Sequence, residues 1–107
     1  MPDREEKRKK IRQDLLDQLE RNGVVGEQYI DLVDAYMHLW DTFHELTDDI
    51  EEKGVSIKWQ NGENQFGYKK NDSVAERNKT VNQMLKVLKQ LGLEPSPSEN
   101  TPVVEEM

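Results

Sequence analysis

Two histidines stand among aspartates in the middle of the chain, at spacings that place them on neighbouring turns of a helix. His38 follows Asp34 by four residues, and His44 lies between Asp41 and Asp48. Carboxylates and imidazoles on adjacent turns are the ligands of two-carboxylate metal sites. However, six residues turn a helix by about 600°, so the two imidazoles point about 120° apart. We therefore favour a solvated acidic helix face, and a metal-dependent enzyme is the remote alternative.

Other catalytic and cofactor-binding motifs are absent from the sequence. It contains neither a Gly-x-x-x-x-Gly-Lys phosphate loop nor a Gly-x-Gly-x-x-Gly dinucleotide motif, and it has no cysteine. Disulfides and thiolate metal sites are therefore impossible, which fits a reducing cytosol. We expect no catalytic residues, no cofactor and no bound metal.

The acidic residues belong to a long amphipathic segment, residues 27–53, that predicts a helix of roughly 40 Å. Apolar side chains alternate at spacings of four and three, and a second row, Val33, Met37 and Trp40, lies beside them. This heptad pattern is typical of a coiled-coil seam. Such a stripe often forms intramolecular core, but two rows exceed what one partner helix covers. We expect an oligomer interface made by Leu32, Tyr36, Leu39, Trp40, Phe43, Leu46 and Ile50.

Two shorter helices flank this segment, and the fold class is therefore mainly α, a three-helix subunit with a long central helix. Residues 3–22 form the first helix, which ends at Asn22-Gly23. Residues 73–91 form the third, beginning with a capping box, Ser73-x-x-Glu76, and ending at Gly92.

A small β-hairpin is predicted between the second and third helices, at about residues 55–68. Apolar and polar side chains alternate there, and Asn61-Gly62 indicates a tight turn between antiparallel strands. Its aromatic residues, Trp59, Phe66 and Tyr68, lie next to lysines, as in platforms that stack single-stranded bases. We favour a packing role, because a hairpin alone is marginal and needs the helices or a neighbouring subunit.

The 107 residues are expected to form one domain, residues 1–92, followed by a flexible acidic tail, residues 93–107. The tail contains three prolines and four glutamates and has little that could pack. The N-terminus has no apolar run typical of a secretory signal, and no stretch is long enough to span a bilayer. We expect a soluble, intracellular protein without a membrane partner.

Charge is separated along the chain, although the net charge is −7. Residues 27–53 carry 1 basic and 9 acidic side chains, whereas residues 54–91 carry 7 and 3. Basic clusters contact DNA phosphates or are simply solvated, and both interpretations stay open here. The candidate DNA-binding residues are Arg4, Lys7, Arg8, Lys9, Lys10, Arg12, Lys69, Lys70, Lys79, Lys86 and Lys89.

The order of features from Leu15 to Ser98 resembles the small subunit of phage terminases. The resemblance lies in a short leading helix, a glycine-bounded link and a long aromatic-rich helix with the run Tyr29-Ile30-Asp31-Leu32-Val33-Asp34-Ala35-Tyr36. After the extended insert comes Lys69-Lys70-Asn71-Asp72-Ser73-Val74, with Asp72 where many members have proline. The last helix ends in Leu91-Gly92-Leu93-Glu94-Pro95-Ser96, similar to the family's Leu-Gly-Leu-Thr-Pro-Ser.

The resemblance implies a ring-shaped homo-oligomer, assembled through the central helices, that acts in the cytoplasm of an infected bacterial host cell. Such a ring recognises double-stranded viral DNA and delivers it to the large terminase subunit, which carries the ATPase and nuclease. Residues 93–107 would then be a candidate docking segment for that subunit. The alternative is a helical coiled-coil-type protein adaptor that does not bind DNA.

Overall fold

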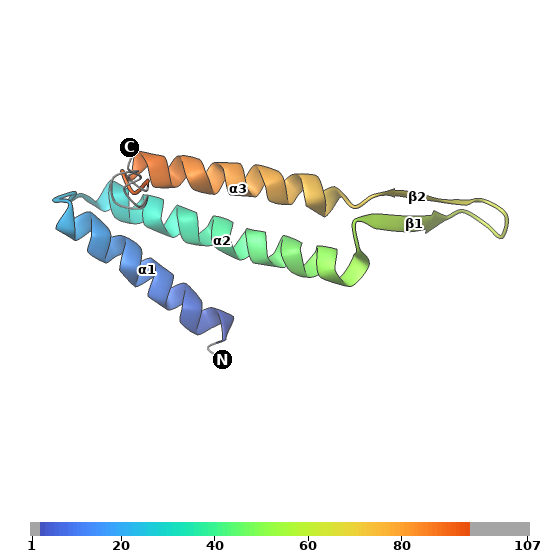
Figure 1. Cartoon of the computed structure of the whole chain (residues 1–107), viewed down its shortest axis with the longest axis horizontal. Coiled ribbons are helices and arrows are strands. Elements are labelled where there is room, and N and C mark those ends of the chain that lie inside the picture. Colours follow the sequence, from blue (N-terminus) through green and yellow to red (C-terminus); the bar gives the residue numbers. More distant parts are fainter. Residues whose placement is uncertain (1–2, 95–107) are drawn as a thin grey trace, which may run out of the picture.

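The computed structural model describes residues 3–94 and contains three helices and one two-stranded antiparallel sheet (Figure 1). The elements are α1 (Arg4–Arg21), α2 (Glu27–Lys53), β1 (Ser56–Gln60), β2 (Phe66–Lys70) and α3 (Asp72–Gln90). α2 and α3 lie side by side, α1 folds back from the start of α2 and splays away from it, and the hairpin extends beyond the helices. The prediction of a mainly α subunit with a small hairpin is confirmed. Within the described residues, no helix has the length and apolar character needed to cross a membrane.

α1 and α3 end in the same glycine-based motif. Gly23, with φ +75°, donates its N–H to Glu20 O, and Val24 N donates to Leu19 O at 2.9 Å. The chain repeats this pattern at Gly92, where Leu93 N donates to Leu88 O at 2.9 Å. A left-handed residue is needed to close such an end, which is why glycine occurs there. Leu93, which we assigned to the tail, packs against the core, and residues 95–107 lie outside the described residues.

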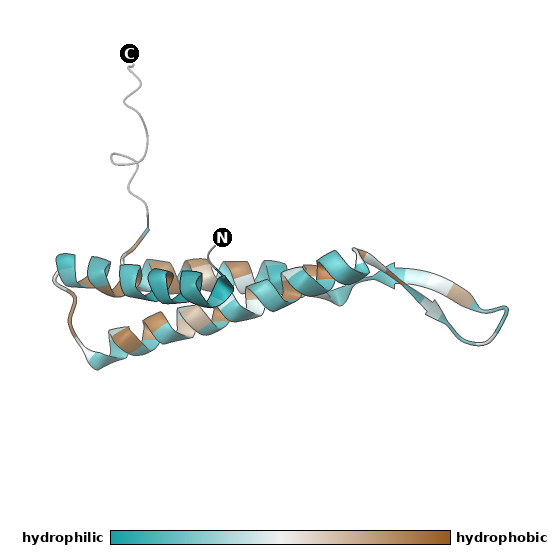
Figure 2. Ribbon diagram, turned by 90° about the horizontal axis from the view of Figure 1, so that it is seen from below, coloured by the Kyte–Doolittle hydropathy of each residue, from teal (hydrophilic) through white to brown (hydrophobic). Residues whose placement is uncertain are grey.

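The core forms where the second apolar row of α2 meets α1 and the end of α3. Val33 and Met37 are fully buried, and burying such a side chain contributes roughly 1.5–3 kcal/mol. The cluster of buried residues is Leu15, Leu19, Val33, Met37, Trp40 and Leu91. Figure 2 shows hydrophobic stretches in all three helices and a further one in the hairpin. Most residues of the predicted heptad row are only half-buried. The second row therefore provides most of the buried core residues of α2.

The start of α3 differs from the predicted capping box. Asn71 is the N-cap, and its Oδ1 accepts from Ser73 N at 3.0 Å. The Ser73 hydroxyl instead donates to Asp49 Oδ2 on α2 at 2.7 Å. Ser73 therefore lies inside the helix, which begins one residue earlier than predicted, and its hydroxyl joins α3 to α2 instead of capping α3.

The hairpin also differs from its prediction in length and turn. β1 and β2 pair from Ser56↔Lys70 to Gln60↔Phe66, so the strands include Lys69 and Lys70. The connection spans residues 61–65 and is closed by Asn61 N donating to Gln65 O at 2.7 Å, so the turn includes Asn61-Gly62, as predicted, but is longer than a tight turn. The aromatic side chains are exposed, so of the two expected packing partners the chain's own helices do not cover them, and packing on a neighbouring subunit stays a prediction.

Candidate nucleic-acid and subunit interfaces

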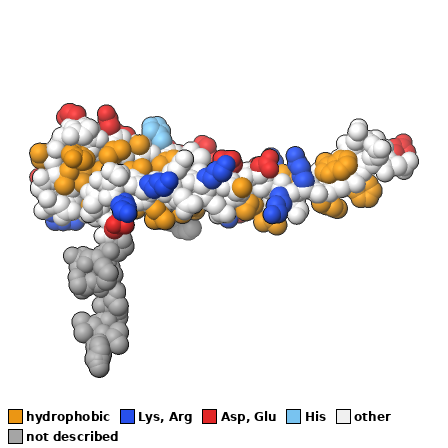
Figure 3. All heavy atoms as spheres, turned by 90° about the horizontal axis from the view of Figure 1, so that it is seen from above, with side chains coloured by type: hydrophobic (Ala, Val, Ile, Leu, Met, Phe, Trp, Pro, Cys, Tyr) orange, Lys and Arg blue, Asp and Glu red, His pale blue; other side chains and the backbone are white. Residues whose placement is uncertain are grey.

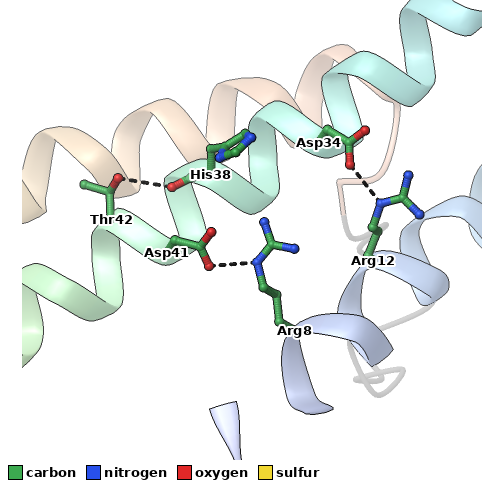
Figure 4. Close-up of polar contacts among 6 residues, drawn as sticks. All are labelled: Arg8, Arg12, Asp34, His38, Asp41 and Thr42. Carbon is green, nitrogen blue, oxygen red and sulfur yellow. Dashed lines mark hydrogen bonds and ion pairs between the residues drawn. The ribbon is translucent and has the colours of Figure 1, made fainter. Parts of the chain in front are cut away.

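Three arginines of the N-terminal basic cluster bind three aspartates on α2. Each guanidinium lies within hydrogen-bond distance of one carboxylate, and Figure 4 shows two of the pairs between the two helices. The pairs are Arg4 Nη1–Asp48 Oδ2 at 2.9 Å, Arg8 Nε–Asp41 Oδ1 at 2.8 Å and Arg12 Nε–Asp34 Oδ1 at 2.8 Å. The hydrogen bond from Arg12 lowers the pKa of Asp34, and the one from Arg4 lowers the pKa of Asp48.

The three arginine–aspartate pairs form a ladder between α1 and α2, and their spacing follows from helix geometry. Residues four apart share a face of α1, and residues seven apart share a face of α2. At 1.5 Å per residue, successive arginines therefore lie about 6 Å apart along α1, and successive aspartates lie about 10.5 Å apart along α2. Figure 1 shows α1 splayed away from α2, so the two helices are not parallel over these three pairs.

The aspartates of the ladder neutralise part of the positive charge that we assigned to DNA contact. Lys7, Lys9 and Lys10 are exposed and form no ion pair within residues 3–94, whereas the three arginines are bound to carboxylates. Phosphates would have to compete with α2 for these arginines. The spacing of both sets is visible in the sequence, but the packing of α1 on α2 was needed to bring them together.

The histidines do not lie on a simple solvated face. His38 is exposed, but His44 is half-buried, with its ring centroid 4.1 Å from that of Trp40 and 5.3 Å from that of Phe43. Burial lowers the pKa of His44, and the charge of Arg4 adds to that effect. Among residues 3–94, no group of three or more His, Asp or Glu side chains is arranged to hold a metal ion. The prediction of a solvated face fits His38 but not His44, whose ring contacts Trp40 and Phe43.

A second set of basic residues lies on the outer face of α3 and on β2. Lys79, Lys86 and Lys89 are exposed and spaced by seven and three, so they share one face of the helix. Figure 3 shows basic side chains distributed along this side of the molecule toward the hairpin. Lys79 lies 3.7 Å from Glu76, a loose contact between two exposed groups. Lys69 and Lys70, also exposed, extend the set into β2.

A shallow apolar groove of about 320 Å³ runs between α2 and α3. Leu85 lies on the α3 side of the groove and is 58% exposed. Such exposure of a leucine beside other apolar side chains is typical of an interaction surface. Burial raises the pKa of Tyr36 on the α2 side. The lining residues are Tyr36, Trp40, Phe43, Val81, Met84, Leu85 and Leu88.

The groove includes part of the predicted oligomer seam. Tyr36 and Phe43 line it and remain half-exposed. Trp40 and Ile50 are already buried by the chain's own helices, at 5% and 9% exposure. The remaining seam residues, all half-buried, are Leu32, Leu39 and Leu46. The exposed apolar surface therefore includes only part of the predicted seam. It also includes α3 residues that the heptad pattern did not identify.

A polar cluster that the sequence analysis missed fixes the base of the hairpin. The Asn71 side chain, which is buried, donates Nδ2 to Asp49 Oδ2 at 3.1 Å and to Gly54 O at 3.0 Å. Hydrogen bonds from Ser73, Lys53 and Asn71 lower the pKa of Asp49 to about 2. An asparagine just before a helical segment is a typical N-cap, so the sequence carries a signal for Asn71. The prediction followed Ser73 instead, because Ser73-x-x-Glu76 has the spacing of a capping box.

Comparison with protein families gives one match. The family described as phage terminase, small subunit, matches residues 9–106, which is nearly the whole chain. No curated protein and no solved structure matches the chain significantly. The match agrees with the resemblance seen in the sequence and with the mainly helical fold. This chain belongs to the family of phage terminase small subunits.

Proposed function

We propose that this protein is the DNA-recognition component of a phage packaging machine. It binds double-stranded viral DNA and delivers it to the large terminase subunit in the cytoplasm of the infected bacterial cell. Family membership supports the packaging role. Members of the family are in general non-catalytic, and the ATPase and nuclease work then belongs to the large subunit.

The observation that carries the DNA contact is the exposed basic row on α3 and β2. Lys79, Lys86 and Lys89 share one face of α3, and Lys69 and Lys70 lie on β2, on opposite faces of the hairpin. Binding to phosphates needs flexible cations and little fixed geometry, so such a row suffices. Another helix, α2, carries nine acidic residues, and four of these are neutralised by ion pairs.

The N-terminal cluster is the secondary contact in this proposal. Lys7, Lys9 and Lys10 are exposed, but Arg4, Arg8 and Arg12 already bind carboxylates. A phosphate must displace an aspartate at each arginine, which lowers the net gain from binding there. We therefore rank this cluster below the row on α3 and β2.

Assembly into a ring-shaped homo-oligomer is the second part of the proposal. The α2–α3 groove, with the exposed Leu85, is the apolar surface that a second copy of the chain would cover. Repeating a weak basic row around a ring adds contacts by multivalency without a strong site on each subunit. The expected docking segment for the large subunit, residues 93–107, is proposed here without Leu93, which packs against the core.

Duplex DNA binding measured by fluorescence anisotropy across a salt series tests the DNA contact. The variant Lys79→Gln/Lys86→Gln/Lys89→Gln should weaken binding. It should also flatten the dependence of log affinity on log salt by about 0.9 for each phosphate that the variant no longer neutralises. Lys7→Gln/Lys9→Gln/Lys10→Gln is the matched control, because it removes the same charge elsewhere. A larger effect of this control would reverse the ranking of the clusters. If the unaltered protein binds no duplex at low salt, the adaptor without DNA binding is the better description.

A further inference from the structure

The hairpin carries the largest exposed aromatic side chains of the described residues. Trp59, Phe66 and Tyr68 are 45%, 55% and 69% exposed, and none belongs to the hydrophobic core. The hairpin extends beyond the ends of α2 and α3, so the helices of its own chain leave these rings uncovered (Figure 1). The Asn71–Asp49 cluster anchors its base to both helices. The protein thus presents aromatic rings on an arm that is fixed at one end.

The composition of the arm is unusual as well. The ten residues of β1 and β2 include three lysines and three aromatic residues and no acidic residue. Lys58, Lys69 and Lys70 are exposed and form no ion pair within residues 3–94. The arm is therefore locally basic, although the chain as a whole carries a net charge of −7.

The strand register divides these side chains between two faces. Lys58 pairs with Tyr68 and Gln60 pairs with Phe66, so these four side chains share one face with Ser56 and Lys70. Trp59 lies on the other face, directly over Gly67, where a built Cβ atom would come within 2.9 Å of its ring. Trp59 therefore covers the strand backbone and stabilises the hairpin, whereas Tyr68 and Phe66 are open to a ligand.

We propose that the Phe66–Tyr68 face of the hairpin binds DNA bases that have left the helical stack. Tyr68 stacks on an unpaired base, and the neighbouring lysines, Lys58 and Lys70, hold the adjoining phosphates. This proposal deepens the proposed function and rests on it, since it assigns a second DNA contact to the same protein. It predicts a preference for single-stranded or locally opened DNA over an intact duplex.

Charge and composition favour a nucleic-acid ligand over a protein partner. Aromatic residues occur in both kinds of interface, but lysine is depleted at the centre of protein–protein interfaces. Here each face combines aromatic rings with lysines. Sites that bind single strands combine flat rings, which stack on bases, with cations, which bind phosphates, and the ammonium of Lys58 lies 4.8 Å from the centre of the Phe66 ring. Because Lys58 covers part of Phe66, Tyr68 is the more accessible stacking surface.

Fluorescence anisotropy with three labelled probes tests the inference: a short single strand, the matching duplex, and the duplex with an unpaired bulge. Tyr68→Thr should weaken binding to the single strand and the bulged duplex by about fivefold or more while changing duplex affinity little. Threonine keeps the strand preference of the site, and Tyr68→Trp should restore the affinity. Val25→Ser is the control, because Val25 is an exposed apolar residue in the link between α1 and α2, and Figure 1 shows that link at the end away from the hairpin.

The remaining outcomes separate this inference from the proposed function. If the unaltered protein binds duplex DNA but Tyr68→Thr binds all three probes as tightly, the inference is wrong and the proposed function stands. If the unaltered protein binds none of the probes, both fail. If Tyr68→Thr changes the native mass of the protein and leaves DNA affinity unchanged, the arm docks on another copy of the chain, which also overturns the inference.

Discussion

The Nε atom of Arg8 donates a hydrogen bond to Oδ1 of Asp41 over 2.8 Å, and this pair is the middle one of the three that join α1 to α2. The apolar residues of α1 that join the core, by contrast, lie between Ile11 and Leu19. The first two turns of α1 are thus attached mainly by charge, and the rest of the helix by apolar packing. The two halves of α1 should respond differently to salt.

We expect high salt to loosen the first two turns of α1 and to leave α2 and α3 intact. Salt screens partly exposed ion pairs but strengthens apolar burial. Hydrogen exchange at backbone amides of residues 5–10 should accelerate in 1 M salt, where the Debye length is about 3 Å, relative to low salt. A double-mutant cycle with Arg8→Ala and Asp41→Ala should give a coupling below about 1 kcal/mol. Unchanged exchange at both salt concentrations would show that packing holds these turns.

Asn71→Ala should destabilise the subunit by about 1–3 kcal/mol, because it removes a helix cap and a buried hydrogen-bonding side chain. Chemical denaturation monitored by circular dichroism measures this effect. Asn82→Ala, at an exposed position of the same helix, is the matched control and should change stability little. Equal effects of the two substitutions would contradict the role that we assign to the Asn71–Asp49 cluster.

Asp49 should make stability depend on pH in the acid range. Its pKa is about 2 in the folded protein, below the ordinary value of 3.8, so the folded state favours the ionised carboxylate. The resulting stabilisation is complete above the ordinary pKa and is lost as the pH falls toward 2. Asp49→Asn should lower the melting temperature at pH 7 by a few degrees, and the difference from the unaltered protein should shrink below pH 3.8. A difference that is constant across this range would rule out the linkage.

Leu85→Glu should disrupt assembly without unfolding the subunit. Leu85 is 58% exposed in the single chain, so a carboxylate is tolerated there until a partner covers the groove. Native mass spectrometry should give a lower mass than for the unaltered protein, with unchanged helicity by circular dichroism. Gln83→Glu, which adds the same charge at an exposed position of α3, is the control. A wild-type mass for Leu85→Glu would place the subunit interface elsewhere.

The same test extends to the α2 side of the groove. Phe43→Asp should also lower the mass, because Phe43 lines the groove and remains half-exposed in the single chain. Leu39→Asp lies on the predicted seam but does not line the groove. A loss of assembly with Leu39→Asp and not with Phe43→Asp would place the interface on the part of the seam that lies outside the groove.

The local elements were determined by the sequence, because their signals act over a few residues. The heptad spacing of 27–53 predicted the bounds of α2, and Gly23 and Gly92 marked the ends of α1 and α3. Backbone geometry alone sets these features, since a left-handed residue at a helix end requires glycine wherever the helix is placed.

Tertiary structure decided which side chains meet. Both apolar rows of α2 fit a helix, but the positions of α1 and α3 decided that Val33 and Met37 form the core. Ser73-x-x-Glu76 has the spacing of a capping box, but Asn71 is the N-cap, and the Ser73 hydroxyl donates to Asp49, 24 residues away. The sequence predicted Arg8 as a cation available to DNA, whereas the packing of α1 on α2 places it against Asp41. Hydrogen bonds and ion pairs between helices depend on their crossing angle and register, and spacing within one segment does not fix either.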